Sequence, residues 1–311
     1  SLTIRDVFEH PTVAQLAEAA SDQETLAPRG PVTGGVPLTP IQAWFFSHQT
    51  GPYDHFNQAV LLHWAGAVDE AALRSAGTAL MVQHDGLRSR FEREASGTWS
   101  QVVEPMADIE WVVEDLREYG QGDAVARMSS VADDVHAGLD LAKGRLVAGG
   151  LFRLPDGDRV LLVIHHLVVD GVSWRVLFED LNTAYRQAQE GAAPQLQPKT
   201  ESFQAWAASV QANAEIRDDD DERRYWEGVC AVALGPLLCI ERGGERESVG
   251  ETLDESDTKT LLARADAQTV AELLGTLGLA IRDLFGRSRV VVNLEGHGRE
   301  QYLSDLEVGR T

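Results

Sequence analysis

Two adjacent histidines stand where an apolar stretch ends and a tight turn begins. His165 and His166 follow Val160–Ile164 and precede Asp170-Gly171. Histidine titrates near neutral pH, so an imidazole in this place could accept and return a proton. Neighbouring side chains on a strand point to opposite faces, so we expect one histidine to face the interior and the other to face a channel.

The residue types alone leave a second interpretation open. A histidine at a strand end is more often hydrogen-bonded and structural than catalytic. A metal site is the weaker hypothesis, because adjacent histidines on a strand diverge. The two cysteines, Cys230 and Cys239, lie nine positions apart with no nearby histidine pair at ligand spacing, so we expect no metal site and no structural disulfide.

The elements that would position the histidines follow from hydrophobic spacing. Val160–Ile164 is continuously apolar, which indicates a central strand covered on both faces. The turn at 155–158 joins it to an apolar strand at Leu146–Arg153, and a helix over Val172–Gln189 follows. Further strands are predicted at Gln58–Trp64, Leu87–Arg93, Trp99–Glu104, Ile109–Asp115 and Val290–Leu294. Further helices are predicted at Asp69–His84, Asp123–Ala137, Ser202–Ile216, Asp221–Val232, Ser256–Arg264 and Thr269–Phe285. Mixed strands and helices predict an α/β or α+β fold.

The length and composition of the chain predict more than one lobe. It has 311 residues, which is past the usual length of a domain with a single core. Because 43% of the residues are hydrophobic, the chain can bury a large core. Residues 1–20 have helical spacing. Residues 21–37 hold three prolines and three glycines, which is typical of a linker. Thr39-Pro40-Ile41-Gln42 predicts a capping box that opens a new domain.

The charge of the chain argues against two classes of partner. Its formal net charge is -22, and such a surface repels phosphate backbones and anionic lipid heads. We therefore expect no nucleic-acid and no membrane partner. No apolar run is long enough to cross a bilayer, and SLTIRDVFEH has no features of a targeting signal, so the cytoplasm is the expected location.

Four segments resemble motifs of one family, in the same order along the chain. His165-His166-x-x-x-Asp170-Gly171 matches the HHxxxDG signature of the condensation-domain superfamily, whose members act on acyl groups tethered to carrier proteins. Its continuation Val172-Ser173-Trp174 resembles the epimerization branch of non-ribosomal peptide synthetases. The other similar segments are Leu38–Phe46, His55–Gln58 and Asn293–Glu300. Residues 38–311 thus resemble an epimerization domain, and residues 1–20 resemble the C-terminal helix of a peptidyl carrier domain.

The resemblance implies a two-lobed, chloramphenicol-acetyltransferase-like fold with a V-shaped cleft. We assign residues 38–190 to the N-lobe and residues 191–311 to the C-lobe, with 21–37 as the linker. Members of the family continue well beyond the position matched by Thr311, so we expect the second lobe to be incomplete in this chain.

The reaction that the resemblance implies is inversion at the α-carbon of an aminoacyl or peptidyl thioester. Inversion needs proton removal on one face of that carbon and proton return on the other. By the resemblance, His166 is one acid/base and Glu295 is the other. Apart from the family, Glu295 would be interpreted as a surface carboxylate or a salt-bridge partner.

Eight further residues are expected to support the reaction. We interpret His165 and Asp170 as structural, with Arg88 as the ion-pair partner of Asp170 by family pattern. The remaining five are assigned by place in the motifs. Gly171 would permit the turn, Ser173 would cap the next helix or bind substrate, Trp174 would pack in the core, and His297 and Arg299 would position Glu295 or the thioester carbonyl.

The matched motifs imply no metal and no free cofactor, because the substrate arrives on carrier-attached phosphopantetheine. The implied partners are the upstream peptidyl carrier domain in cis and the condensation domain of the next module downstream. Two alternatives remain. One is a condensation enzyme that joins two carrier-bound substrates through an amide bond, and the other is an inactive module that only docks carriers.

Overall fold

The computed structural model describes residues 12–15, 31–64, 66–216, 220–232, 250–263, 269–294, 296–299 and 308–310. The chain forms two compact units: residues 1–216 with 297–311, and residues 217–296. The predicted lobes, 38–190 and 191–311, divide the chain differently and stay a prediction. The helix predicted in residues 1–20 lies, apart from 12–15, outside the described residues.

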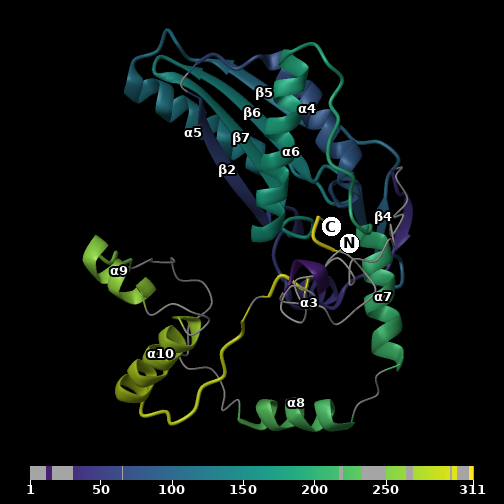
Figure 1. Ribbon diagram of the computed structural model, residues 1–311, viewed down its shortest axis with the longest axis vertical. Coiled ribbons are helices and arrows are strands. Elements are labelled where there is room, and N and C mark those ends of the chain that lie inside the picture. Colours follow the sequence, from purple (N-terminus) through teal and green to yellow (C-terminus); the bar gives the residue numbers. More distant parts are fainter. Residues whose placement is uncertain are drawn as a thin grey trace. The chain divides into compact units, whose positions relative to one another are not determined.

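A four-stranded sheet is the centre of the first unit (Figure 1). Its strands, in spatial order, are β2 (Asn57–Trp64), β7 (Gly157–His165), β6 (Val147–Leu154) and β5 (Glu110–Asp115). β7 is antiparallel to both of its neighbours, while β5 and β6 are parallel. The central place of β7 confirms what its continuous apolar run predicts.

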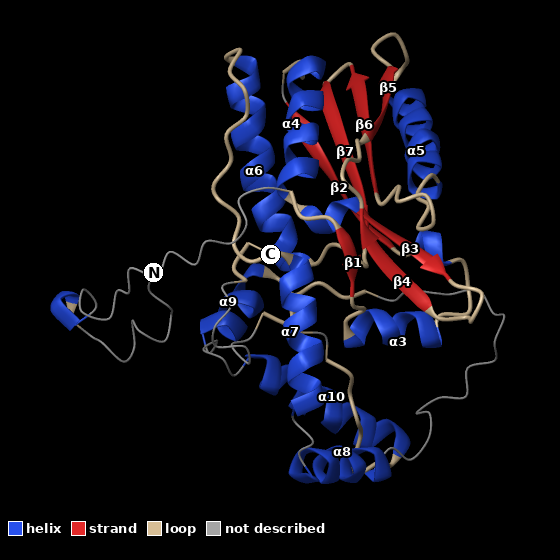
Figure 2. Cartoon of the chain, turned by 90° about the vertical axis from the view of Figure 1, so that its right-hand side faces the viewer, coloured by secondary structure: helices blue, strands red, loops and turns tan. Residues whose placement is uncertain are grey.

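Helices cover both faces of this sheet (Figure 2). α4 (Glu70–Gln83) and α6 (Gly171–Gln189) lie on one face, and α5 (Gln121–Ala137) lies on the other. Side chains of β7 alternate between the two cores. Val160, Leu162 and Ile164 pack with α4 and α6, whereas Leu161 and Val163 pack with α5. The two histidines continue this alternation at the end of the strand.

A smaller, three-stranded sheet lies in the same unit. Its order is β1 (Gly34–Val36), β4 (Trp99–Val103) and β3 (Ser89–Arg93), all antiparallel. The prediction of a linker over 21–37 is wrong at its end, because the backbone of Gly34–Val36 pairs with β4. α3 (Pro40–His48) follows β1, and α7 (Phe203–Ile216) packs Ala207 against Val36 and Val103.

The second unit contains the helices α8 (Asp220–Val232), α9 (Glu255–Ala263) and α10 (Thr269–Phe285). The strand predicted at Val290–Leu294 does not form in the structure. A strand needs a partner for its backbone N–H and C=O groups, and the described residues offer none here. The mixed class of the fold is confirmed, since strands and helices alternate through the first unit.

Candidate active site

His165 is built into the backbone around it. Its side chain is fully buried, and Nε2 donates to the carbonyl oxygen of Tyr53 at 2.8 Å. Nδ1 accepts a hydrogen bond from the backbone N–H of Leu167 at 3.2 Å. Each ring nitrogen therefore has a hydrogen-bond partner when the imidazole is neutral and carries its proton on Nε2. Burial lowers the pKa of His165 below its ordinary value, which fits a structural role.

His166 leaves the strand on the opposite face and is only half-buried. Its backbone N–H donates to the carbonyl oxygen of Phe56 at 2.8 Å, and the Phe56 ring stacks on the imidazole with centroids 5.0 Å apart. Nδ1 lies 3.0 Å from the carbonyl oxygen of Val169, and Nε2 lies 3.1 Å from Nε2 of Gln58. The ring is thus held on its face and at both nitrogens.

Asp170 begins the helix that follows the histidines. It is the N-cap of α6 and accepts from the backbone N–H and the hydroxyl of Ser173, each at 2.7 Å. The prediction that Ser173 caps this helix is wrong, because its hydroxyl donates to the cap instead. Gly171 has no positive φ, and a Cβ there would meet no described atom within 4 Å, so the turn does not require glycine at this position.

The arginine that pairs with Asp170 is Arg299, so the prediction that Arg88 is this partner is wrong. Arg299 donates to Oδ2 of Asp170 at 2.5 Å. Arg88 is buried beyond the end of α4, where it pairs with Asp85 at 2.5 Å and donates to the carbonyl oxygen of Met81 at 2.8 Å. A buried guanidinium needs local acceptors, and these groups supply them to Arg88.

Arg299 brings the Gly-His-Gly-Arg segment onto the start of α6. Its guanidinium also donates to the hydroxyl of Ser173 at 3.1 Å, and its backbone N–H donates to Nδ1 of His297 at 3.0 Å. Burial alone would raise the pKa of Asp170, but the hydrogen bonds from Arg299 and Ser173 outweigh it and the pKa is lowered. Asp170 is therefore an ionised anchor that joins two motifs. Glu295 lies outside the described residues, four positions before Arg299 in the sequence.

Trp174 does more than pack in the core. The ring is buried, and its Nε1 donates to Oε1 of Gln58 at 2.8 Å. The sequence motifs include Gln58 but predict no role for it. The signal that could have indicated a role is a polar side chain near the start of β2, at the position that pairs with Ile164 of the central strand β7.

The segment that opens the domain packs against the histidine loop. Gln42, which is buried, accepts from the backbone N–H of Thr39 at 3.0 Å and donates to the carbonyl oxygen of Leu167 at 3.3 Å. Phe45 from the same helix lies edge-on to His165, with ring centroids 6.3 Å apart. Three of the motifs predicted from the sequence therefore meet around the two histidines.

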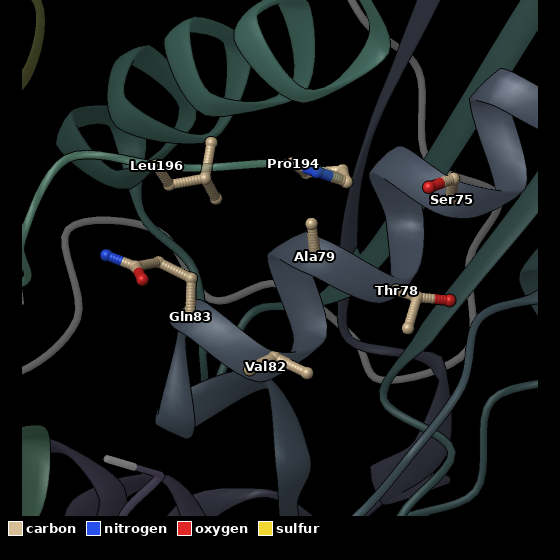
Figure 3. A pocket seen from close by; sticks show the side chains of 7 residues that line it. All are labelled: Ser75, Thr78, Ala79, Val82, Gln83, Pro194 and Leu196. Carbon is tan, nitrogen blue, oxygen red and sulfur yellow. The ribbon is translucent and has the colours of Figure 1, made fainter. Parts of the chain in front are cut away.

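The other candidate sites of the described residues are weaker. A pocket lies between α4 and the segment after α6 (Figure 3), and none of its lining residues belongs to the histidine motif: Ser75, Thr78, Ala79, Val82, Gln83, Pro194 and Leu196. Nowhere in the described parts of the chain do three or more His, Cys, Asp or Glu side chains gather in a way that could hold a metal ion. None of the described helices is long and apolar enough to span a membrane.

The comparison with protein families decides what this arrangement belongs to. The model of the condensation domain matches residues 32–309, a range that includes both histidines and Arg299. The chain belongs to the condensation-domain family. The resemblance to the condensation-domain superfamily and the fold class that it implies are thereby confirmed, whereas the expected incompleteness of the second lobe stays a prediction.

Relatives of this condensation-family chain are large peptide synthetases. It is 36% identical to surfactin synthase subunit 1 of Bacillus subtilis (strain 168), over all of this chain and 9% of that protein. It is 38% identical to chondramide synthase cmdD of Chondromyces crocatus, over all of this chain and 8% of that protein. The chain thus spans a small part of the relatives that it matches. It is an enzyme-type domain of the non-ribosomal peptide synthetase condensation superfamily.

Solved structures with the condensation-family fold agree. The epimerization domain from the third module of tyrocidine synthetase B is 34% identical and superposes with a TM-score of 0.79, covering 92% of this chain and 66% of that chain. The first condensation domain of the calcium-dependent antibiotic synthetase is 21% identical with a TM-score of 0.61, covering 85% and 64%. The second likeness concerns the fold alone.

Proposed function

We propose that this domain is an epimerase that inverts the α-carbon of an aminoacyl or peptidyl thioester. A thioester makes the α-hydrogen removable as a proton, because the remaining electron pair delocalises into the carbonyl group. Inversion then requires that a proton return to the opposite face of the planar intermediate. Proton transfer by side chains is sufficient for this reaction, so the proposal needs no metal and no resident cofactor.

His166 is the base in this proposal. The Cα–H bond breaks, its electron pair passes into the thioester carbonyl as an enolate, and the proton passes to Nε2 of His166. A second acid on the other face returns a proton to the α-carbon, and exchange with solvent restores both groups. By position in the Glu-Gly-His-Gly-Arg segment we propose Glu295 for this second role.

The observation that carries the proposal is the contact of Arg299 with Asp170 and Ser173. Ser173 belongs to the Val-Ser-Trp continuation and Arg299 to the Glu-Gly-His-Gly-Arg segment, the two features that resemble epimerization domains more than condensation domains. They lie 126 positions apart in the sequence, yet their side chains are hydrogen-bonded. Similarity to an epimerization domain at 34% identity supports the same conclusion.

We further propose that the substrate arrives on the phosphopantetheine arm of a carrier domain. The peptidyl carrier domain upstream in cis would supply it, and the condensation domain of the next module would accept the product. The large relatives support this arrangement, since each is many times longer than the matched segment.

Chiral analysis of a loaded carrier tests the proposed reaction. The protein is incubated with a carrier domain that holds an L-aminoacyl phosphopantetheine, and the amino acid is then released and its enantiomers are separated. A mixture of D and L forms is expected. Unchanged L material with amide formation on an added acceptor carrier would indicate a condensation enzyme. No change in either assay would indicate a module that only docks carriers.

Replacing the proposed second acid tests Glu295. Glu295→Gln keeps the shape of the side chain but removes its capacity to hold and donate the proton. We expect the rate of inversion to fall about 100-fold or more, in the range typical of a lost general acid. Inversion at the unchanged rate would remove Glu295 from the mechanism.

A further inference from the structure

A chain of side-chain hydrogen bonds runs through His166. Nε1 of Trp174 donates to Oε1 of Gln58 at 2.8 Å. Nε2 of Gln58 lies 3.1 Å from Nε2 of His166, and Nδ1 of His166 lies 3.0 Å from the carbonyl oxygen of Val169. Each link is within hydrogen-bonding distance. The links join β2, α6 and the loop after β7 at one imidazole.

The two ends of this chain fix its direction. An indole N–H can only donate, so the amide oxygen of Gln58 faces Trp174 and its NH2 group faces His166. A carbonyl oxygen can only accept, so Nδ1 of His166 carries the proton. Nε2 is then the acceptor of the Gln58 N–H. His165, the preceding residue, has the opposite tautomer.

We infer that Gln58, held by Trp174, is a positioning residue that fixes His166 in the Nδ1-protonated tautomer with Nε2 as the basic atom. This inference rests on the proposed function, since it concerns the same base. In the structure the Gln58 N–H occupies the lone pair that proton transfer needs. When the substrate binds, its Cα–H group must therefore displace the Gln58 N–H from Nε2 of His166. The hydrogen bond between Trp174 and the amide oxygen of Gln58 remains.

The amide of Gln58 cannot turn over without losing a hydrogen bond. A reversed amide would place its NH2 group against the indole N–H of Trp174, which is also a donor. Trp174 therefore keeps the NH2 group of Gln58 directed at Nε2 of His166.

Two substitutions of Gln58 separate its roles. Gln58→Leu keeps the bulk and removes the amide, so the tautomers of His166 should mix and kcat should fall about 10- to 100-fold with KM little changed. Gln58→Glu offers only acceptors to both neighbours. Because Nδ1 must still donate to Val169, both ring nitrogens would then carry protons and the base would be lost. The loss of kcat should be larger than for Gln58→Leu.

The tautomer is measured directly by ¹⁵N NMR of the histidine-labelled protein, with His166 assigned by comparison with His166→Ala. We expect a protonated Nδ1 and an unprotonated Nε2 in the unsubstituted protein, mixed tautomers in Gln58→Leu and an imidazolium in Gln58→Glu at neutral pH. The same substitutions at Gln83, an amide on α4 that donates to the carbonyl oxygen of Gln197, should change neither spectrum nor rate.

Trp174→Phe tests the chain of hydrogen bonds at the end opposite His166. Without the indole N–H the Gln58 amide can turn over, so this variant should share the mixed tautomers, and the double variant with Gln58→Leu should be no slower than Gln58→Leu alone. A protonated Nε2 in the unsubstituted protein, or an unchanged spectrum in Gln58→Leu, would overturn the inference. Altered tautomers with unchanged kcat would overturn its part in the reaction. Absence of inversion in the unsubstituted protein, with the expected spectra, would instead reject the proposed function.

Discussion

His165 and His166 are adjacent in the sequence, but their ring nitrogens contact different groups, and this difference sets their roles. Both nitrogens of His165 bind backbone groups, whereas Nε2 of His166 meets the side chain of Gln58. Backbone groups cannot move without unfolding the loop, but a side-chain amide can be displaced by substrate. The alternation of strand side chains predicts that the two histidines differ in role. It cannot predict Gln58 or Arg299, because these partners are 108 and 129 positions from His166 and Asp170.

The lowered pKa of His165 predicts how stability depends on pH. The unfolded chain binds a proton at His165 near pH 6.5, whereas the folded state binds it only at lower pH. The unfolded state therefore holds more protons between these values, and the free energy of unfolding should fall as the pH drops through about 6.5. Urea denaturation between about pH 8 and about pH 5.5 measures this slope.

A variant identifies His165 as a source of that slope. His165→Asn should be less stable at about pH 8, since it loses a buried hydrogen bond worth about 1 kcal/mol, but its stability should depend less on pH. His136 also has a pKa lowered by burial and is retained in the variant, so a residual slope is expected. An unchanged slope would show that His165 is not the group that titrates.

At the scale of elements, local patterns predicted most of the first unit. The apolar strands β6 and β7, their tight turn and the helix α6 follow from spacing and turn residues within one contiguous stretch of the chain. The failures are elements whose partners are remote. Gly34–Val36 has no strand pattern and becomes one by pairing with β4, whereas Val290–Leu294 has the pattern and lacks a described partner.

The packing of the parallel strands β5 and β6 can be tested at Gly149, where the backbone of β6 lies close to a side chain of β5. Gly149 lies opposite Trp111, and a Cβ at Gly149 would overlap the indole ring. Gly149→Ala should therefore reduce the free energy of unfolding by about 1–3 kcal/mol, the usual cost of overpacking. Gly122→Ala in α5, where a Cβ meets nothing described within 4 Å, is the matched control and should be neutral or slightly stabilising. Equal effects of the two variants would contradict this packing.

At the scale of the whole molecule, the last described residues are tied to the middle of the chain. Arg310 donates to Oδ1 of Asp180 at 2.6 Å, and its backbone N–H donates to the hydroxyl of Thr200 at 3.0 Å. Oδ2 of the same buried Asp180 lies 2.9 Å from Nε2 of His84, which follows α4. One carboxylate thus joins α6, the end of α4 and residues 308–310. The sequence motifs predicted the family of the chain. They could not predict the contacts of Asp180 with Arg310 and His84, because none of these residues belongs to a motif.

Removal of that charge should destabilise the first unit. Asp180→Asn removes the negative charge and leaves one acceptor oxygen where Arg310 and His84 each contact an oxygen of their own, and we expect a loss of about 2–3 kcal/mol in the free energy of unfolding. Glu179→Gln is the matched control. Its carboxylate also contacts Arg310 but is 62% exposed, so its loss should cost less than about 1 kcal/mol. Similar unfolding midpoints for the two variants would contradict a structural role of Asp180.

The central claim is that Nε2 of His166 removes the α-proton of a tethered thioester. The most direct measurement is the incorporation of deuterium at the α-carbon of a carrier-bound L-aminoacyl group in heavy water, followed by mass spectrometry of the released amino acid. We predict incorporation with the unsubstituted protein and none above background with His166→Ala. Full incorporation by His166→Ala would show that another group is the base.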